Sequence, residues 1–178
     1  YQYSLKRRLF MNKTNTMKKL NFSSALWYIV TVGGTMGLGF LSGLLSGADA
    51  GYEGYTRPPL TPPDLTFAIV WPVLYFLTGT SMYLMLNASA EGDKKPIKAA
   101  SLVLWLIGVV LSFAWSFVFF TLDLKTLAFI VSTLIFACIT GVIVLDFFYC
   151  KTAAWLNIPF MLWVGFATYL GIFIALYN

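Results

Sequence analysis

The chain alternates between long apolar stretches and mostly short polar joins. Five stretches, at about 25–47, 65–88, 99–121, 126–148 and 153–177, each approach the roughly 20 apolar residues that an α-helix needs to cross a bilayer. Charged and turn-forming residues gather in the joins, of which only 48–64 is long. The pattern predicts an all-α integral membrane protein, a five-transmembrane-helix bundle.

The first apolar stretch is too long for a cleaved signal peptide, and no small-residue cleavage site precedes a soluble domain. Residues 1–16, ahead of Met17, are polar, and we expect them to be an N-terminal extension or leader outside the fold. Residues 17–178 then form a single membrane domain.

Composition supports a membrane protein. Of the 178 residues, 59% are apolar and 11% are charged, and the mean hydropathy is +0.78. A soluble domain carries about 25% charged residues, so this chain has too little polar surface to cover a water-soluble globule. The aromatic content of 18% also suits a bilayer protein, whose interfaces favour Trp and Tyr.

The net charge of +5 follows the predicted topology. If the N-terminus is cytoplasmic, that side holds most of the basic residues: Lys6, Arg7, Arg8, Lys13, Lys18, Lys19, Lys94, Lys95, Lys98 and Lys151. The opposite side holds Arg57 and Lys125, together with the long 48–64 join. Because positive residues favour the cytoplasmic side, we expect this orientation and no nucleic-acid partner.

Groups that carry common enzyme chemistry are missing. The sequence has no His, Walker loop, dinucleotide fingerprint, nucleophile elbow or metal-binding cluster, so no metal site and no cofactor are expected. Cys138 and Cys150 lack metal-ligand spacing and are expected to be structural. Asp146 is the only ionisable residue assigned to a span, and it lies near the span's end. An ion-coupled transporter, which needs charges deep in the bilayer, is therefore disfavoured, and a passive one stays open.

Glycines in the first stretch recur at helical spacing: Gly33, Gly37, Gly39, Gly43 and Gly47. Such small residues let two helix backbones approach closely in lipid. They predict either packing within the chain or the seam of a homodimer.

The stretch Thr56–Trp71, TRPPLTPPDLTFAIVW, places four prolines directly before the second span. Thr61 and Asp64 have the spacing of a capping box, with Pro62 at the first helical position. We therefore expect a stiff loop that ends in a capped helix. Inside that helix, Pro72 deprives the carbonyl of Ala68 of its donor and predicts a bend beside Trp71.

Aromatic and small residues share faces of three predicted helices. The second span carries Trp71, Tyr75, Thr78 and Met82; the third carries Trp105, Gly108, Ser112, Trp115 and Phe119; the fifth carries Trp155, Pro159, Trp163, Phe166, Ala167 and Tyr169. If these faces turn inward, the rings either pack the bundle or leave room between them for a flat apolar ligand. A metal-free tetrapyrrole that stacks on indoles would fit such a site.

These motifs resemble the TspO/translocator-protein family, also called tryptophan-rich sensory proteins or peripheral benzodiazepine receptors. The resemblance covers essentially all of residues 17–178. It is most specific at PPLTPPDLTFAIVWPVLY (58–75), LSFAWSFVFF (111–120) and IPFMLWVGFATYL (158–170). It implies a five-helix bundle, commonly dimeric, in a bacterial cell membrane or, in a eukaryote, the mitochondrial outer membrane. Porphyrins, and often sterols or benzodiazepine-site ligands, would bind beneath the loop that joins the first two helices.

The resemblance also implies which residues form the ligand site: Tyr52, Pro62, Pro63, Trp71, Tyr75, Ser112, Trp115, Ser116, Trp163 and Ala167. Trp71 and Trp163 correspond to the indoles implicated in a proposed light-dependent breakdown of porphyrin, and would be catalytic only if that reaction occurs.

The chain departs from the family at several positions. Leu60 replaces the usual Trp between the prolines, and Ser112 and Gly171 replace two Asn residues, so ligand preference should differ. No Lys or Arg follows Tyr169, which breaks the C-terminal cholesterol-recognition pattern. The segment Leu145–Lys151 matches that pattern formally, but an interfacial Tyr149 and a snorkelling Lys151 explain it better.

The favoured hypothesis is a membrane receptor or sensor that binds a porphyrin, with membrane lipid and a second copy of the chain as partners. Two alternatives remain: photo-oxidative degradation of porphyrin, and passive translocation of porphyrin or lipid.

Overall fold

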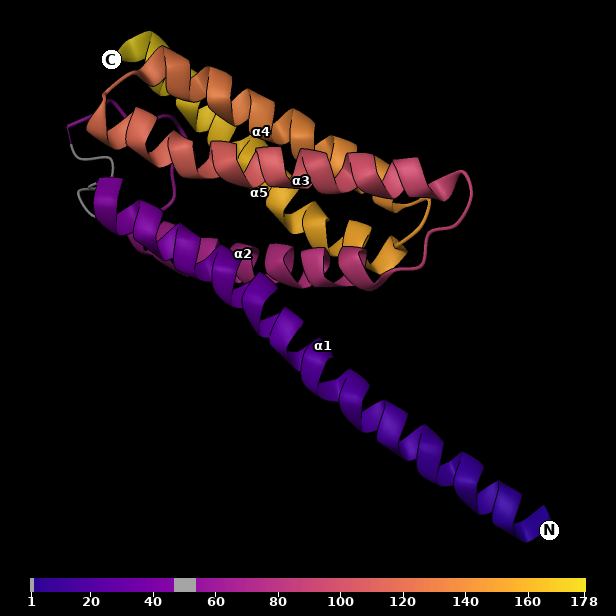
Figure 1. Cartoon of the computed structure of the whole chain (residues 1–178). Helices are drawn as coiled ribbons and strands as arrows, with labels where there is room; N and C mark the ends of the chain where they lie inside the picture. The colour runs from indigo at the N-terminus through magenta and orange to yellow at the C-terminus, as the bar shows by residue number, and fades with distance from the viewer. Residues whose placement is uncertain (1, 47–53) are drawn as a thin grey trace.

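The structure, a computed structural model, describes the backbone of residues 2–46 and 54–178 and the side chains of residues 24–46 and 54–178. The chain folds into α1 (Gln2–Ser46), α2 (Asp64–Asn87), α3 (Lys94–Ser116), the π-helical segment η2 (Phe117–Thr121), α4 (Lys125–Asp146) and α5 (Lys151–Tyr177) (Figure 1). Five segments are long and apolar enough to cross a membrane, at Ser24–Ser46, Asp64–Asn87, Lys94–Thr121, Lys125–Asp146 and Lys151–Tyr177. The predicted five-helix membrane bundle is confirmed, with span boundaries within a few residues of those expected.

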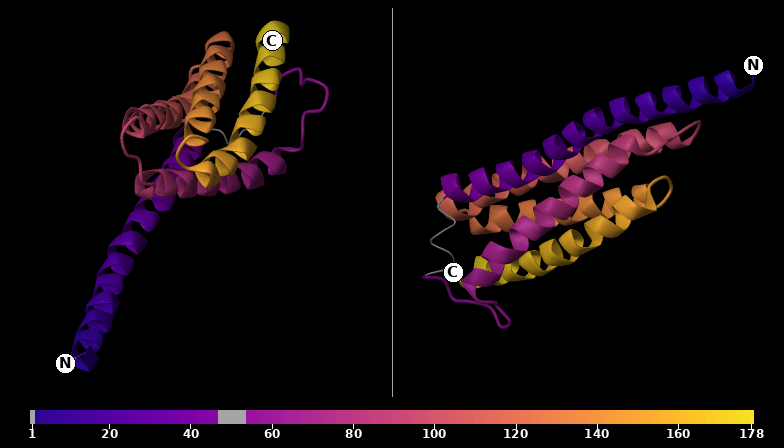
Figure 2. Two further views of the ribbon diagram at one scale, coloured as in Figure 1. Left: turned by 90° about the vertical axis from the view of Figure 1, so that its right-hand side faces the viewer. Right: turned by 90° about the horizontal axis from the view of Figure 1, so that it is seen from below.

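The five helices form a ring in which sequence neighbours are not always spatial neighbours. α1 packs on α2, α2 on α5, α5 on α4, and α4 on α3 (Figure 2). The ring closes between α3 and α1, where the Ser42 hydroxyl donates to the Phe113 carbonyl at 3.1 Å. The aromatic stripes lie on α2, α3 and α5. In the ring, α4 lies between α3 and α5, and α1 lies between α2 and α3.

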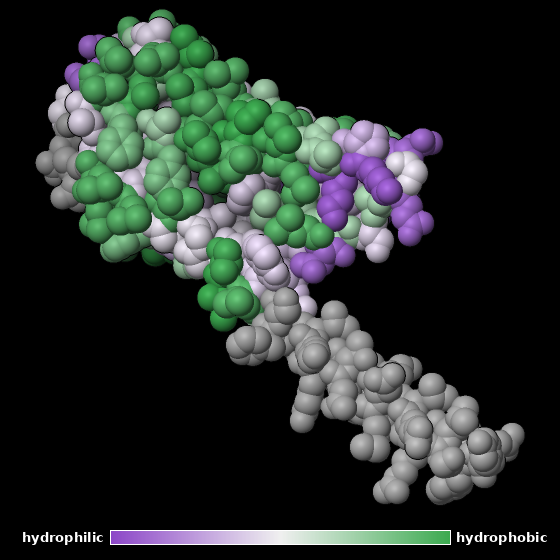
Figure 3. Space-filling view, in the orientation of Figure 1, coloured by the Kyte–Doolittle hydropathy of each residue, from purple (hydrophilic) through white to green (hydrophobic). Residues whose placement is uncertain are grey.

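The two ends of the bundle differ in charge. The turns at 88–93 and 147–150 lie at what we call the lysine-rich end, with Lys94, Lys95, Lys98 and Lys151. Figure 3 shows the hydrophilic residues gathered there, beside a largely hydrophobic body. The opposite end carries the loop 54–63, the turn 122–124 and the C-terminus, and we call it the lid end (Figure 1). Many large apolar side chains between the two ends are exposed, as expected of a surface that meets lipid.

The glycine ladder of α1 contributes to packing at one position. A Cβ on Gly39 would collide with the ring of Tyr75 on α2, so this glycine lets α2 approach. A Cβ on Gly33, Gly37 or Gly43 would meet nothing within 4 Å, and Gly47 lies outside the described residues. Most of the described ladder is therefore not used for packing within the chain.

The closest approach of α1 to α2 depends on a glycine in the second helix. A Cβ on Gly79 would lie 2.7 Å from the Cα of Val32 and 2.9 Å from the carbonyl oxygen of Thr31. The Thr35 hydroxyl donates to the Tyr75 carbonyl at 3.1 Å across the same contact. Because the obstacle is backbone, it cannot rotate away, and Gly79 sets the separation of the two helices.

The predicted capping box at the start of α2 is wrong. α2 begins at Asp64, Pro63 occupies the N-cap position, and no side chain caps the helix. The Thr61 hydroxyl instead donates to the Pro58 carbonyl at 2.7 Å, and Asp64 pairs with Arg57 at 3.3 Å. The helix begins at Asp64, later than a Thr61 cap requires, and the Thr61 hydroxyl bonds back into the loop.

Substitution of Gly79 by Ala tests this contact. The added methyl must push α1 away from α2, and we expect a loss of about 1–3 kcal/mol in the free energy of unfolding. Gly34→Ala adds the same methyl to α1 in open space and should be neutral or slightly stabilising, because Ala is the better helix former. Unfolding of both variants in micelles would measure the difference; equal stability would contradict the assignment.

Candidate functional site

Four aromatic rings line the contact between α2 and α5, and we call them the aromatic seam. Phe67 of α2 meets Trp163 of α5 edge to face, with ring centroids 5.5 Å apart. One turn along each helix, Trp71 meets Phe160 in the same way at 6.3 Å. Because the two helices run antiparallel, the spacing of four on α2 and three on α5 brings these pairs into register. Both Trp rings are half-buried.

Trp163 keeps a free hydrogen-bond donor in this seam. Its Nε1 atom is buried and has no hydrogen-bond partner among the described residues. The ring lies 5.7 Å from that of Phe166, and Ala167 follows one turn further along α5. An indole N–H normally finds a partner when it is buried, so this donor is available to a ligand.

A second aromatic group lies at the lid end of α3. Trp115 stacks on Phe119 with centroids 5.0 Å apart and planes at 19°, and its Nε1 donates to the Ala128 carbonyl of α4 at 3.0 Å. The π-helical turn, closed by the Leu122 amide to the Phe117 carbonyl at 2.9 Å, carries Phe119 inward. Phe67 packs against this group as well, and so joins it to the aromatic seam.

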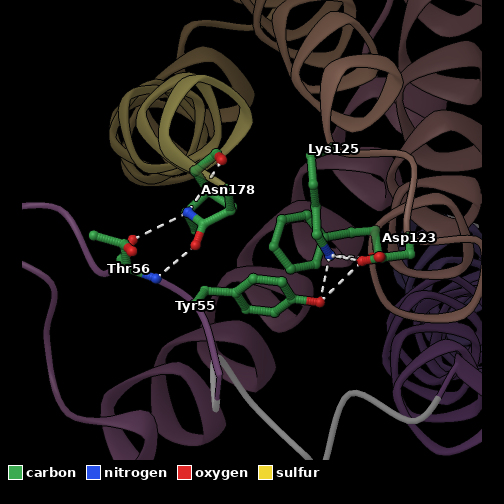
Figure 4. Close-up of polar contacts among 7 residues, drawn as sticks. Tyr55, Thr56, Asp123, Lys125 and Asn178 are labelled. Atoms are coloured by element: carbon green, nitrogen blue, oxygen red, sulfur yellow. Dashed lines mark hydrogen bonds and ion pairs between the residues drawn. The ribbon is translucent and has the colours of Figure 1, made fainter.

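The loop 54–63, which we call the lid, is fastened over these rings through Tyr55 (Figure 4). The Tyr55 ring meets Phe119 edge to face at 6.0 Å, and its hydroxyl donates to Asp123 Oδ1 at 3.0 Å. Lys125 Nζ donates to the Tyr55 hydroxyl at 2.7 Å, lies 2.6 Å from Asp123 Oδ1, and sits 4.0 Å from the centroids of both rings. The hydrogen bond from Lys125, followed by that from Tyr55, lowers the pKa of the exposed Asp123 carboxyl. The carboxylate is therefore charged at neutral pH.

The C-terminal residue fastens the lid at a second point. The Thr56 amide donates to Asn178 Oδ1 at 2.7 Å, and Asn178 Nδ2 donates to the Thr56 carbonyl at 3.3 Å (Figure 4). The Tyr169 hydroxyl donates to the Pro59 carbonyl at 3.1 Å. The lid thus bonds to α5 and to the turn before α4, which are the elements that flank the aromatic rings.

The proline stretch forms a turn that projects away from the bundle. The Thr61 amide donates to the Pro58 carbonyl at 3.3 Å, and Leu60 has a φ of 69°, a left-handed conformation that a non-glycine residue rarely adopts. The Leu60 side chain is 83% exposed. Pro62, half-buried, and Pro63, exposed, then lead into α2.

The structure distributes the expected site residues over several places. Trp71, Trp163 and Ala167 belong to α2 and α5 at the seam. Ser112 is buried with its hydroxyl donating to Gly108 at 2.8 Å, and Ser116 ends α3 beside Trp115.

Two tyrosines, Tyr75 and Tyr52, were also expected at the ligand site. Tyr75 stacks on Trp71 at 5.5 Å but packs over Gly39 of α1, on the side away from α5. Tyr52 lies outside the described residues.

One inward-facing residue was predicted wrongly, and others were missed. Trp155 is 64% exposed, because Ala153, Ala154 and Asn157 take the buried face of α5. Tyr55, Phe160 and Asn178 were not predicted. Phe67 was also missed, although it precedes Trp71 by one helical turn on the same stripe.

Among the described residues, the small residues of the stripes border a small space in the middle of the bundle. A cavity of about 10 Å³ lies among α2, α3, α4 and α5, lined in part by Thr78, Trp105, Gly108 and Phe160. This is room for about one water molecule. The aromatic seam and the lid end are therefore the better candidate for an organic ligand.

Known proteins place this architecture in a family. The sequence model of the TspO/MBR family matches residues 28–177, which include all but the first four residues of the Ser24–Ser46 span and the other four spans in full. The chain belongs to the TspO/MBR family. This membership supports a membrane sensor or translocator-type role for an integral, multi-pass membrane protein.

Individual relatives agree with the assignment. The chain is 30% identical over 140 residues to a protein of Bacillus cereus named "Tryptophan-rich protein TspO", covering 77% of this chain and 87% of that one. Proteins of the same name from Chlorobaculum tepidum and Archaeoglobus fulgidus are each 29% identical over 127 residues, covering 71% of this chain and 78% and 79% of theirs.

Asn178→Leu tests how this TspO/MBR protein fastens its lid. The change removes both bonds to Thr56, and the Thr56 amide should exchange its hydrogen about 5–10-fold faster, as the loss of roughly 1 kcal/mol or more predicts. Asn87→Leu is a matched control, because Asn87 donates to the Tyr83 carbonyl at the lysine-rich end. Hydrogen exchange of the segment 54–57 measures the effect, and equal rates in both variants would contradict the proposed attachment.

Proposed function

We propose that this protein is a membrane receptor or sensor that binds a flat tetrapyrrole, of the protoporphyrin type, against the aromatic seam and beneath the lid. The observation that carries the proposal is the seam itself, with the buried and unpartnered Nε1 of Trp163 beside it. The family resemblance adds sterols and benzodiazepine-site ligands as further ligand classes.

The chemistry of the seam suits such a ligand. Indole and phenyl rings offer broad apolar faces on which a macrocycle can stack, and the Trp163 N–H can donate to a polar atom at its edge. The rings contact one another in the described structure, so a ligand must part the Phe67–Trp163 and Trp71–Phe160 pairs or lie along their half-exposed edges. The lid bonds would have to break and re-form to admit it.

A second candidate function is the light-dependent oxidation of the bound porphyrin by oxygen. Trp71 and Trp163 both belong to the seam, so a macrocycle bound there would contact two oxidisable indoles. Illumination with protoporphyrin and oxygen should then give a defined product that Trp71→Phe and Trp163→Phe abolish. Nonspecific bleaching at the same rate in all variants would remove this candidate.

We expect the lysine-rich end to face the cytoplasm, from a bacterial cell membrane or, in a eukaryote, from the mitochondrial outer membrane. Support comes from the described cations: Lys94, Lys95 and Lys151 are exposed at that end, whereas Arg57 and Lys125 at the lid end are each paired with an aspartate.

The proposed assembly is a homodimer through the face of α1 that carries Gly33, Gly37 and Gly43. A Cβ at any of these positions meets open space within the chain, which leaves them free for close approach by a second helix. Gly37→Phe should convert the dimer to a monomer in a mass measurement of the protein–detergent complex, with Gly37→Ala as the milder control. A wild-type monomer would rule out this assembly.

Porphyrin binding has a direct test with a matched control. Trp163→Phe keeps an aromatic ring but removes the free donor, and we expect protoporphyrin to bind about tenfold more weakly, as the loss of one buried hydrogen bond predicts. Trp155→Phe alters an exposed indole at the other end of α5 and should leave affinity unchanged. Titration in nanodiscs measures both, and equal affinities would argue against the seam as the site.

A further inference from the structure

Polar side chains are buried near the lysine-rich end, away from the proposed ligand site. Ser81, Ser101, Asp146 and Asn157 come from α2, α3, α4 and α5, and each is 0% exposed. They form two bonded pairs. Asn157 Nδ2 donates to Ser81 Oγ at 2.7 Å, and Ser101 Oγ donates to Asp146 Oδ1 at 2.6 Å.

Asp146 stands out because only half of its carboxylate is satisfied. Its Oδ2 atom is buried and has no hydrogen-bond partner among the described residues. The ion pairs found in the described part of the chain, Arg57–Asp64 and Lys125–Asp123, both lie at the lid end. A buried carboxylate that lacks a counter-ion is costly, and an ionisable residue in a span marks a functional site by default.

Tyr149 lies in the 147–150 turn, three residues after Asp146. Its hydroxyl is buried and has no hydrogen-bond partner among the described residues. Burial raises the pKa of the Tyr149 phenol, and the nearby Asp146 carboxylate raises it further. The phenol therefore keeps its proton and can offer it as a hydrogen-bond donor beside the carboxylate.

The neighbouring charged groups do not neutralise Asp146. Lys98, one turn before Ser101 on α3, donates from Nζ to the carbonyls of Leu86 and Ala88, each at 2.8 Å. Lys151, at the start of α5, is exposed. Cys150 lies in the turn beside Tyr149, and the last turns of α2 carry no charged residue.

We propose that Asp146, with Ser101 and Tyr149, forms a proton-binding site at the lysine-rich end of the bundle. A proton from the adjoining water adds to Oδ2 and converts the carboxylate to a neutral carboxylic acid, and the reverse step returns the same proton to water. Protonation removes the charge from the apolar core, keeps the Ser101 bond to Oδ1, and gives Oδ2 a hydrogen to donate.

A proton fits this site better than a metal cation does. A hard cation takes about six oxygen ligands, whereas the Ser81 oxygen already accepts a bond from Asn157 and the Ser101 hydroxyl is bonded to Asp146.

The site adjoins the interior of the bundle. Ser101 is one turn from Trp105 on α3, and Asp146 is one turn from Val142 on α4; Trp105 and Val142 both line the small central cavity. A change of charge at Asp146 would therefore alter the electric field at a buried indole.

The test uses the full chain in nanodiscs without porphyrin, so its result is independent of the proposed ligand. Infrared spectra recorded over a pH titration should show the C=O band of one buried carboxylic acid, which Asp146→Asn abolishes. Asp123→Asn is the matched control, because it removes an exposed aspartate at the lid end and should keep the band. Wild-type protein without such a band, or Asp146→Asn with an unchanged one, would overturn the proposal.

Two further variants keep the test decisive if Asp146→Asn does not fold. Ser101→Ala and Tyr149→Phe retain the carboxyl group but change its hydrogen bonding, and both should shift the midpoint of the band's titration. Unchanged midpoints in both variants would overturn the proposal that Ser101 and Tyr149 form the site with Asp146. A wild-type midpoint that depends on sodium at constant ionic strength would also overturn it, in favour of a cation site.

Discussion

The contact between α2 and α5 is the interaction on which the proposed ligand site depends. At the lysine-rich end it consists of buried hydrogen bonds: Ser81 Oγ donates to the Ala153 carbonyl at 3.2 Å and accepts from Asn157. At the lid end it consists of aromatic rings, whose contacts are apolar and less directional. Lipid gives two apolar helices no hydrophobic reason to associate, so such polar bonds and close packing hold the pair together. The α2–α5 pair is thus fastened at one end and adaptable at the other.

The lid follows a different physical rule from the helices that it covers. Its bonds run from Tyr55, Thr56 and Pro59 to side chains at the ends of other elements, in contact with water. Each such bond contributes only about 0.5–1.5 kcal/mol, because water competes for the same groups. Several weak bonds hold the lid in one place, and each can be broken separately. This combination suits a cover over a binding site better than a permanent cap.

The sequence predicted the spans well, since hydropathy and length are properties of single segments. The sequence predicted less well how each helix is rotated about its own axis, and so which of its faces meets a neighbour. The glycines of α1 recur at helical spacing, but Gly37 and Gly39 lie on nearly opposite sides of the helix. Which of them meets α2 depends on where Gly79 and Tyr75 lie on the other helix. The inward position predicted for Trp155 was wrong for the same reason, because the small residues beside it occupy the buried face of α5. The Thr61 cap was wrong because α2 begins only at Asp64, and the Thr61 hydroxyl bonds to Pro58 in the loop.

The candidate site was predicted in part. Motifs on single helices identified Trp71, Trp115 and Trp163, and the same stripes extended by one turn would have reached Phe67 and Phe160. No local pattern could have joined Thr56 to Asn178, which are 122 residues apart. Contacts of this kind appear only when the ring of helices brings the C-terminus beside the first loop.

The distribution of carboxylates separates structural charges from the one proposed to be functional. Asp64 and Asp123 lie at the water-exposed lid end, and each has a cation beside it that satisfies its charge. Asp146 is fully buried, receives one hydroxyl bond, and lies at the end where the described lysines are most numerous, yet none is paired with it. If a permanent charge were required there, Lys98 is one turn from Ser101 and could have supplied a partner. Its ammonium group instead donates to the carbonyls of Leu86 and Ala88. An acid kept away from its nearest base can gain and lose a proton without breaking an ion pair, and this separation is what a proton-binding site needs.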